Sequence, residues 1–172
     1  DVHAVLQRTD AYCRQKRFEM MLDLVLNPTP STSDDGVLGY LFKHKPIKNL
    51  GQLYFLLKKH RGKDKRYCSL HCFARLFVKN YTPPIRPPPG TVSTIMAKFK
   101  DIEFLHKRYA PENRPFFSYY FLLRLFLSEV GLVEHTRYVK KLKCPHRCSA
   151  YKTLYKSLIK HSRISVGAWG NV

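Results

Sequence analysis

"PENRPFFSYYFLLRLFLSEVGL", residues Pro111–Leu132, is the most apolar stretch of the chain, and the predicted fold depends on it. A helix that spans a membrane needs about 20 consecutive apolar residues. Here Arg124 interrupts the apolar run, and Ser128 and Glu129 close it. A helix that is apolar almost all round, yet too short for an anchor, belongs in the centre of a helical domain. We therefore expect a buried core helix over residues 116–130.

The residues that flank this run carry signals for the two ends of a helix. Asn113 is of a type that caps helix starts, and Pro115 suits a first helical turn. Gly131 fits the position just past the C-terminus, where the backbone turns left-handed, and Leu132 can make the apolar contact that follows it. These signals predict a helix that begins directly after Pro115 and ends before Gly131.

Outward from this helix, apolar residues recur at helical spacing along most of the chain. The spacing predicts an N-terminal helix and further helices over the segments 50–62, 67–81, 91–109 and 151–159. No segment alternates convincingly like a strand, and "RISVGAWGNV", residues 163–172, offers one short strand at most. The predicted fold class is all-α: a single compact domain of about six helices around the central apolar helix.

Two segments rich in helix breakers divide the chain. "NPTPSTSDDG" at Asn27–Gly36 predicts a mobile loop, which separates an N-terminal helix and loop over residues 1–42 from a helical core over residues 43–172. "TPPIRPPPG" at Thr82–Gly90 predicts a stiff, extended connector inside that core, because proline lacks the N–H that helices and central strands use. We expect both parts to form one folding unit.

The composition indicates an anionic partner. The chain of 172 residues carries 31 Lys and Arg against 12 Asp and Glu, a formal net charge of +19. Hydrophobic residues make up 44% of it, which excludes a disordered basic tail. A folded domain that keeps so much self-repulsion is typical of a protein that binds nucleic acid. The charge alone does not distinguish DNA from RNA.

The positive residues recur in three clusters. The first lies in "KKHRGKDKR" at Lys58–Arg66 and the second in "RYVKKLK" at Arg137–Lys143, while the third repeats every fourth residue and projects from one side of the last helix. Lysine and arginine on a shared surface contact phosphates without reading base sequence. The predicted nucleic-acid-binding residues are Lys58, Lys59, Arg61, Lys63, Lys65, Arg66, Arg137, Lys140, Lys141, Lys143, Lys152, Lys156 and Lys160.

The cysteines form two pairs with one spacing, "CSLHC" and "CPHRC". Two such pairs can supply the four thiolates of a tetrahedral zinc site. The predicted ligands are Cys68, Cys72, Cys144 and Cys148. Cys68 and Cys72 fall in the helix predicted over 67–81, and the alternative is that this pair only fills the core. Five cysteines in a chain without a visible signal peptide favour a reduced, intracellular compartment.

The segment "DIEFLH" places Glu103 and His106 three residues apart, which is the spacing of ligands in di-iron bundles. Such a site needs carboxylates from other helices, and a solvated helix face that pairs Glu103 with Lys107 is the stronger interpretation. The sequence has no glycine-rich phosphate loop, no G-x-S-x-G elbow and no kinase motif. We therefore expect a protein that is not an enzyme.

Four motifs in a fixed order resemble one protein family. They are "PPP" at Pro87–Pro89, "FKDIE" at Phe99–Glu103, "PENRPFFSYYFLLRLF" at Pro111–Phe126 and "GLVEH…YVKKLK" at Gly131–Lys143. Their order and spacing are similar to those of the late gene transcription factor 3 family of poxviruses and other large DNA viruses. Residues that carry the resemblance include Arg114, Phe117, Ser118, Tyr119, Gly131 and Lys143.

The resemblance implies a non-enzymatic factor that acts with a viral RNA polymerase on late promoters, in the cytoplasm or nucleus of a host cell. It implies DNA, the polymerase and other transcription factors as partners. Members of the family carry a zinc-binding segment near the N-terminus, where this chain has only Cys13. Two alternatives are a structural RNA-binding protein of the ribosomal type and a virion protein that binds DNA nonspecifically.

Overall fold

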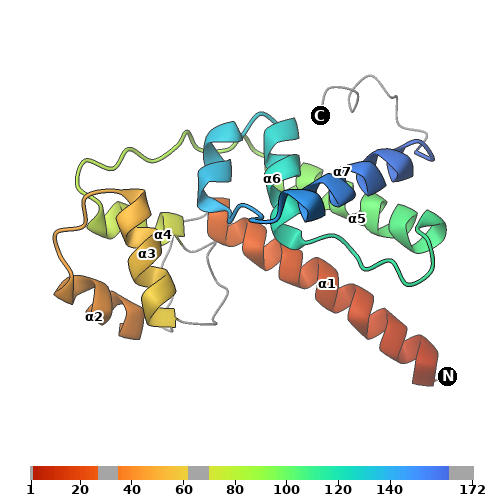
Figure 1. The fold of residues 1–172 in the computed structure, drawn as a ribbon, viewed down its shortest axis with the longest axis horizontal. Helices are drawn as coiled ribbons and strands as arrows, with labels where there is room; N and C mark the ends of the chain where they lie inside the picture. Colours follow the sequence, from red (N-terminus) through yellow and green to blue (C-terminus); the bar gives the residue numbers. More distant parts are fainter. Residues whose placement is uncertain (1, 27–34, 62–69, 163–172) are drawn as a thin grey trace.

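A computed structural model describes the backbone of residues 2–26, 35–61 and 70–162, and the side chains of residues 14–26, 36–60 and 73–162. These ranges contain seven α-helices and one 3-10 helix, so the fold is all-α, as predicted (Figure 1). In chain order they are α1 (Val2–Leu26), α2 (Asp35–Lys43), α3 (Leu50–Arg61), α4 (Leu70–Phe77), α5 (Thr91–Tyr109), α6 (Tyr119–Glu129), η3 (Val133–Tyr138) and α7 (Pro145–Ile159).

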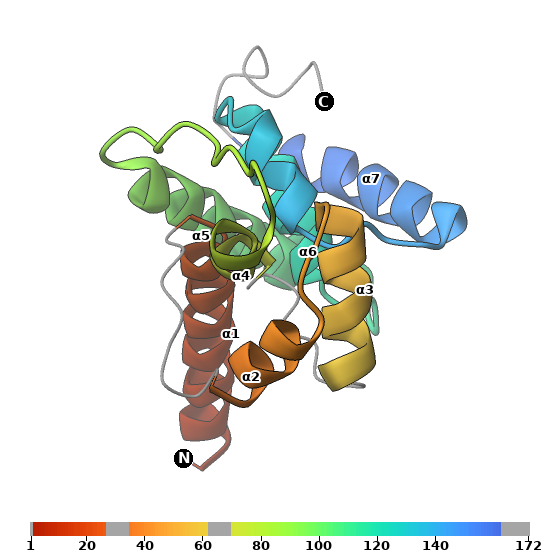
Figure 2. The ribbon, with the colours of Figure 1, turned by 90° about the vertical axis from the view of Figure 1, so that its left-hand side faces the viewer.

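The helices form two groups joined by α1. Helices α2, α3 and α4 contact one another and lie towards one end of the long axis (Figures 1 and 2). Helix α5 contacts α6 and α7, and α6 contacts η3. Helix α1 contacts α4 in the first group and both α5 and η3 in the second. The proline-rich connector over residues 82–90 runs from α4 to α5 without helix or strand, as predicted (Figure 1).

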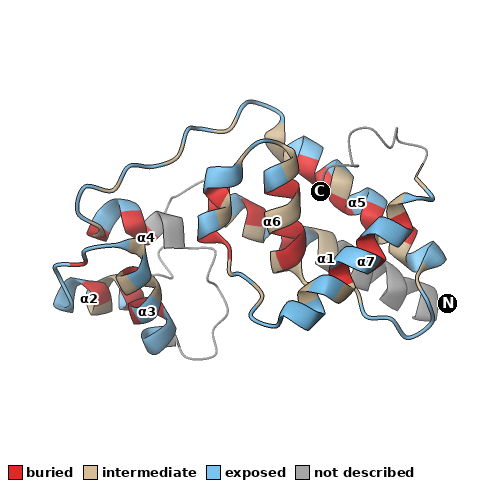
Figure 3. Cartoon of the chain, turned by 45° about the horizontal axis from the view of Figure 1, so that its top comes forward, coloured by how far each residue is buried: buried red, intermediate tan, exposed pale blue. Residues whose placement is uncertain are grey.

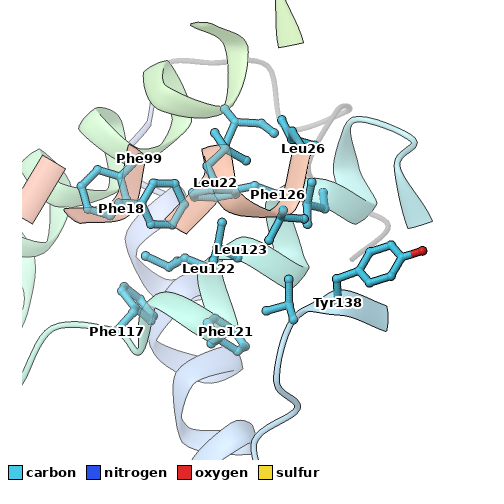
Figure 4. Close-up of a cluster of buried hydrophobic side chains, with 14 of the residues drawn as sticks. Phe18, Leu22, Leu26, Phe99, Phe117, Phe121, Leu122, Leu123, Phe126 and Tyr138 are labelled. Carbon is cyan, nitrogen blue, oxygen red and sulfur yellow. The ribbon is translucent and has the colours of Figure 1, made fainter. Parts of the chain in front are cut away.

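One continuous core of buried side chains takes residues from all eight of these helices. On α6, Leu122, Leu123 and Phe126 have no exposed surface, and they meet α1 and α5 at Phe18 and Phe99 (Figure 4). The rings of Phe18 and Phe99 stack with centroids 4.3 Å apart. Both predicted parts of the chain, 1–42 and 43–172, therefore contribute to the same core; the loop residues 27–34 between them lie outside the described ranges.

Helix α6 begins at Tyr119, later than the sequence predicts, and its N-cap is Ser118. Asn113 does not cap it; its φ of 62° places it in a turn in which the Arg114 N–H donates to the Pro111 carbonyl over 3.1 Å. The residues after this turn are not helical, and the two neighbouring rings contact different sets of helices. Phe116 contacts Phe99 and His106 of α5. Phe117 contacts His106 as well, and it also reaches Tyr151 and Tyr155 of α7.

The C-terminal end of α6 is confirmed. Gly131 has a φ of +83°, and the N–H of Leu132 donates to the carbonyl of Leu127 over 2.8 Å. The N–H of Gly131 donates to the carbonyl of Ser128 over 3.2 Å. These two hydrogen bonds define a Schellman motif, which satisfies carbonyls that the end of a helix leaves unpaired.

Other predicted elements differ at their ends. The helix predicted over 67–81 is shorter, because α4 ends at Phe77 and Val78 pairs with Ile47 in an isolated parallel bridge. Helix α2 is a helix that the sequence did not predict. The last helix, predicted over 151–159, begins earlier at Pro145, so Cys144 is the N-cap of α7 and Cys148 lies within that helix. The strand proposed for 163–172 lies outside the described residues.

Candidate nucleic-acid interface

Helix α7 separates an apolar face from a positive one. Pro145 occupies its first turn, where a missing N–H costs nothing. Tyr151, Leu154, Tyr155 and Leu158 are buried against the core, which is the face the sequence predicts. Lys152, Lys156 and Lys160 are exposed. The ribbon of α7 carries both buried and exposed positions (Figure 3). Because residues four apart stack along a helix, the three ammonium groups project from the same side of α7.

The second cluster begins on η3 and continues towards α7. Arg137 lies in the last turn of η3, and Lys140, Lys141 and Lys143 follow in the segment that leads into α7. The start of this segment is held by Arg124 of α6, whose Nη1 donates to the carbonyls of Thr136 and Val139 over 2.7 and 3.1 Å. Burial lowers the pKa of Arg124. Arg124, the charged residue that interrupts the apolar run of α6, therefore holds η3 beside α6.

The first cluster is described only in part. Lys58 and Lys59 are exposed near the end of α3. The side chain of Arg61 and all of Lys63, Lys65 and Arg66 lie outside the described residues. Helices α3 and α7 lie towards opposite ends of the long axis, so the structure does not bring the described part of the first cluster, Lys58 and Lys59, close to the third cluster (Figure 1).

The structure does bring Arg137 together with two cations that sequence reasoning missed. Lys48, Lys79 and Arg137 line a cavity of about 530 Å³ between the start of α3, the end of α4 and η3. The other lining residues are Asn49, Leu50, Gly51, Val78, Asn80, Tyr81 and Thr82. No Asp or Glu lines this cavity. We refer to it as the Lys48–Lys79–Arg137 pocket.

The parallel bridge between Ile47 and Val78 places the two lysines of this pocket. Ile47 is fully buried, and its carbonyl accepts a hydrogen bond from the N–H of Lys79 over 3.4 Å. Successive side chains in extended backbone point to opposite sides. Lys48 and Lys79, which directly follow the paired residues, are both exposed. No local sequence signal predicts this arrangement, because the bridge joins segments on either side of α3 and α4.

A pair of tyrosines holds Arg137 at the pocket. The hydroxyls of Tyr81 and Tyr138 are hydrogen-bonded to each other. Arg137 donates from Nη2 and Nε to the Tyr138 hydroxyl over 3.0 and 3.2 Å, and from Nη2 to the Thr82 carbonyl over 3.4 Å. Hydrogen bonding to Tyr138 raises the pKa of Arg137, and burial raises the pKa of Tyr81. Tyr81 therefore stays neutral at physiological pH and does not offset the positive charge of Arg137.

The proposed zinc ligands are described only in part. Cys144 is exposed and Cys148 half-buried, one helical turn apart. Cys68 and the side chain of Cys72 lie outside the described residues, so the shared site stays a prediction. Among the side chains that are described, no three from His, Cys, Asp and Glu gather closely enough to hold a metal ion.

The acidic segment of α5 has a structural role that differs from the expected one. The sequence favoured a solvated pair of Glu103 and Lys107, but Glu103 faces α1 and its side chain is only 13% exposed. Its Oε1 accepts a hydrogen bond from Gln15 over 2.8 Å, and its Oε2 lies 3.6 Å from Nη1 of Arg14. His106 contacts the Pro115 carbonyl at 3.2 Å, and burial lowers its pKa. These residues join α5 to its neighbours.

The residues that carry the family resemblance lie mostly in and around α6. Phe117 is buried and Tyr119 meets Phe18 and Phe99 edge-on. Ser118 and Gly131 bound the helix at its two ends, while the side chains of Arg114 and Lys143 are exposed.

Comparison of the chain with protein-family models, with curated proteins and with solved structures found no match. Among the described helices, none combines the length and the apolar character needed to cross a bilayer. Fold and surface together define an all-α domain with exposed rows of positive side chains.

Proposed function

We propose that this protein is a non-enzymatic factor that binds nucleic acid, and more specifically a late gene transcription factor of a large DNA virus that acts with the viral RNA polymerase. Binding of nucleic acid is supported by the net charge of +19 and by the positive face of α7. The specific role is supported by the ordered motifs from Pro87 to Lys143. This role as a late gene transcription factor places the activity in the cytoplasm or nucleus of the host cell.

The observation that carries the proposal is the division of α7 into two faces. Its buried face anchors the helix, so the row of Lys152, Lys156 and Lys160 is held in place on a rigid element. None of these lysines makes an ion pair with a described residue, although 12 acidic residues are present in the chain. A fixed, unneutralised row of positive charge binds a phosphate backbone through Coulomb attraction and counterion release.

A salt titration of duplex DNA binding tests this function. For B-DNA, log K falls against log[salt] with a slope of about 0.9 per phosphate contact. Changing Lys152, Lys156 and Lys160 together to Gln should reduce the slope by up to about three such contacts. Binding should weaken equally on all sequences, because phosphate contacts carry no base information.

The matched control removes the same charge elsewhere. Lys43, Lys100 and Lys107 are exposed and belong to none of the three clusters. Their triple change to Gln lowers the net charge equally and should leave the slope within about one contact of the wild type. If both triple variants have the wild-type slope, the positive face of α7 does not contact the phosphates, and the proposal fails.

A further inference from the structure

We propose that the Lys48–Lys79–Arg137 pocket holds one phosphate group of the bound nucleic acid strand. This inference rests on the proposed function for the nature of the ligand. It goes beyond that function because a discrete pocket, in contrast to an exposed row of lysines, binds a phosphate at one defined place on the protein.

The lining of the pocket is positively charged. Three cations line it, and no Asp or Glu does. A second cavity of about 530 Å³, between α1 and α5, also contains lysines, but Glu19 lies on its wall. Lys48 and Lys79 make no ion pair with a described residue. The partners of Arg137 include the hydroxyls of Tyr138 and Tyr81 and the Thr82 carbonyl, which are neutral groups. The positive charge of the pocket is therefore available to an anion.

The cations of the pocket are preorganised. Arg137 is held by its hydrogen bonds to Tyr138 and Thr82. The bridge between Ile47 and Val78 fixes the backbone of both lysines. An anion that enters the pocket thus meets charges that are already positioned, which reduces the ordering cost of binding.

The pocket has the size and the donors that a phosphate needs. About 530 Å³ lies within the range of sites for small ligands, roughly 300–1,000 Å³, and admits a phosphate with its attached sugar. The three cations supply charge-assisted hydrogen-bond donors for the phosphate oxygens.

Pyrophosphate, titrated into the ¹⁵N-labelled full chain, tests the pocket without a nucleic acid. The amide signals of Leu50, Gly51, Lys79 and Asn80 should shift and saturate together. In the double variant Lys48→Gln, Lys79→Gln the affinity should fall at least about tenfold, which corresponds to about 1.4 kcal/mol. Both side chains are exposed, so the variant should keep the wild-type spectrum outside the pocket.

The double variant Lys152→Gln, Lys156→Gln is the matched control, because it removes the same charge from α7. It should bind pyrophosphate like the wild type. Shifts spread over all three basic clusters, or equal affinities in the wild type and the pocket variant, would overturn the inference.

Oligonucleotides with and without a 5′-phosphate identify the source of the phosphate. A preference for the 5′-phosphorylated strand that the pocket variant loses assigns the pocket to a chain end. Equal binding of both strands, weakened equally in the pocket variant, assigns it to an internal phosphodiester. Both results support the inference.

The two proposals fail separately. Pyrophosphate in the pocket of a chain that binds no oligonucleotide contradicts the proposed function, and with it nucleic acid as the source of the phosphate, but not the phosphate site itself. Oligonucleotide binding that is the same in the wild type and the pocket variant contradicts the pocket alone.

Discussion

At the scale of single residues, Gly131 is a position where backbone conformation restricts the choice of amino acid. Its φ of +83° completes the Schellman motif after α6. A residue with a Cβ in this conformation costs about 1–2 kcal/mol. We expect Gly131→Ala to lower the free energy of unfolding by that amount in urea denaturation.

Gly39→Ala is the control for this change. Gly39 lies within α2, has no positive φ, and a Cβ there would meet no atom within 4 Å. Alanine should stabilise α2 by roughly 0.5–1 kcal/mol relative to glycine. The two Gly→Ala changes should therefore have opposite signs, and a loss of stability in both would contradict the role given to the backbone at Gly131.

His135 makes stability depend on pH. It is 3% exposed, its Nδ1 has no hydrogen-bond partner among the described residues, and burial lowers its pKa. The unfolded chain, with a histidine pKa of about 6.5, takes up the proton first. The free energy of unfolding should therefore fall as the pH drops through about 6.5.

The measurement is urea denaturation between about pH 7.5 and pH 5.5 for wild type and His135→Gln. The variant should show a shallower decrease in stability with falling pH, and parallel curves would exclude His135 as the cause. His106, whose pKa is also lowered by burial, leaves a residual slope of the same sign in both proteins. Glu129 contributes the opposite sign, since burial raises its pKa, and it cancels in the comparison.

At the scale of elements, α6 supplies the centre of the shared core, and it is also the helix about which the sequence was most informative. Its apolar character predicted a buried central helix, and Gly131 predicted its end. Its start was misplaced because Asn113 and Pro115 are equally compatible with the turn that precedes α6. Local signals cannot tell that Phe116 packs on α5 while Phe117 packs on both α5 and α7, because these contacts join distant segments.

The elements that the sequence missed depend on contacts between distant segments. Helix α2 contains Gly36 and Gly39, which weaken a helical pattern, and it is stabilised by Val37 and Leu41 in the shared core.

Contacts between distant segments also limit how much of the candidate nucleic-acid interface could be predicted from the sequence. The lysine row of α7 follows from helical periodicity, whereas Lys48, Lys79 and Arg137 meet only because a bridge and a pair of tyrosines join three segments.

Arg124 shows how α6 fixes its neighbour. It supplies two hydrogen bonds to the carbonyls of Thr136 and Val139. Arg124→Met should keep the length of the side chain but leave these carbonyls without their donor, at a cost of about 1–3 kcal/mol. Arg75→Met on the exposed side of α4 should change the free energy of unfolding by less than about 0.5 kcal/mol. Equal effects in urea denaturation would show that Arg124 does not hold η3.

At the scale of the whole molecule, the net charge of +19 opposes the compact state that the shared core maintains. The ion pairs that join described helices include Lys98, which lies 3.2 Å from Glu129, and Arg14, which lies 3.6 Å from Glu103. With so few acids, most positive side chains are repelled by one another more than they are attracted by a partner. The excess of positive charge that favours binding to a polyanion therefore also makes the stability of the free protein depend on ionic strength.

Raising NaCl from about 50 mM to about 300 mM shortens the range over which charges interact from roughly 14 Å to below 6 Å. Screening removes more repulsion than attraction here, so the folded state should gain stability. For a domain of this size each kcal/mol gained corresponds to a rise in Tm of about 2–4 °C. The triple variant Lys152→Gln, Lys156→Gln, Lys160→Gln starts with less repulsion and should show a smaller rise in thermal unfolding. A Tm that falls with added salt would mean that ion pairs, and not repulsion, dominate the electrostatics of the folded chain.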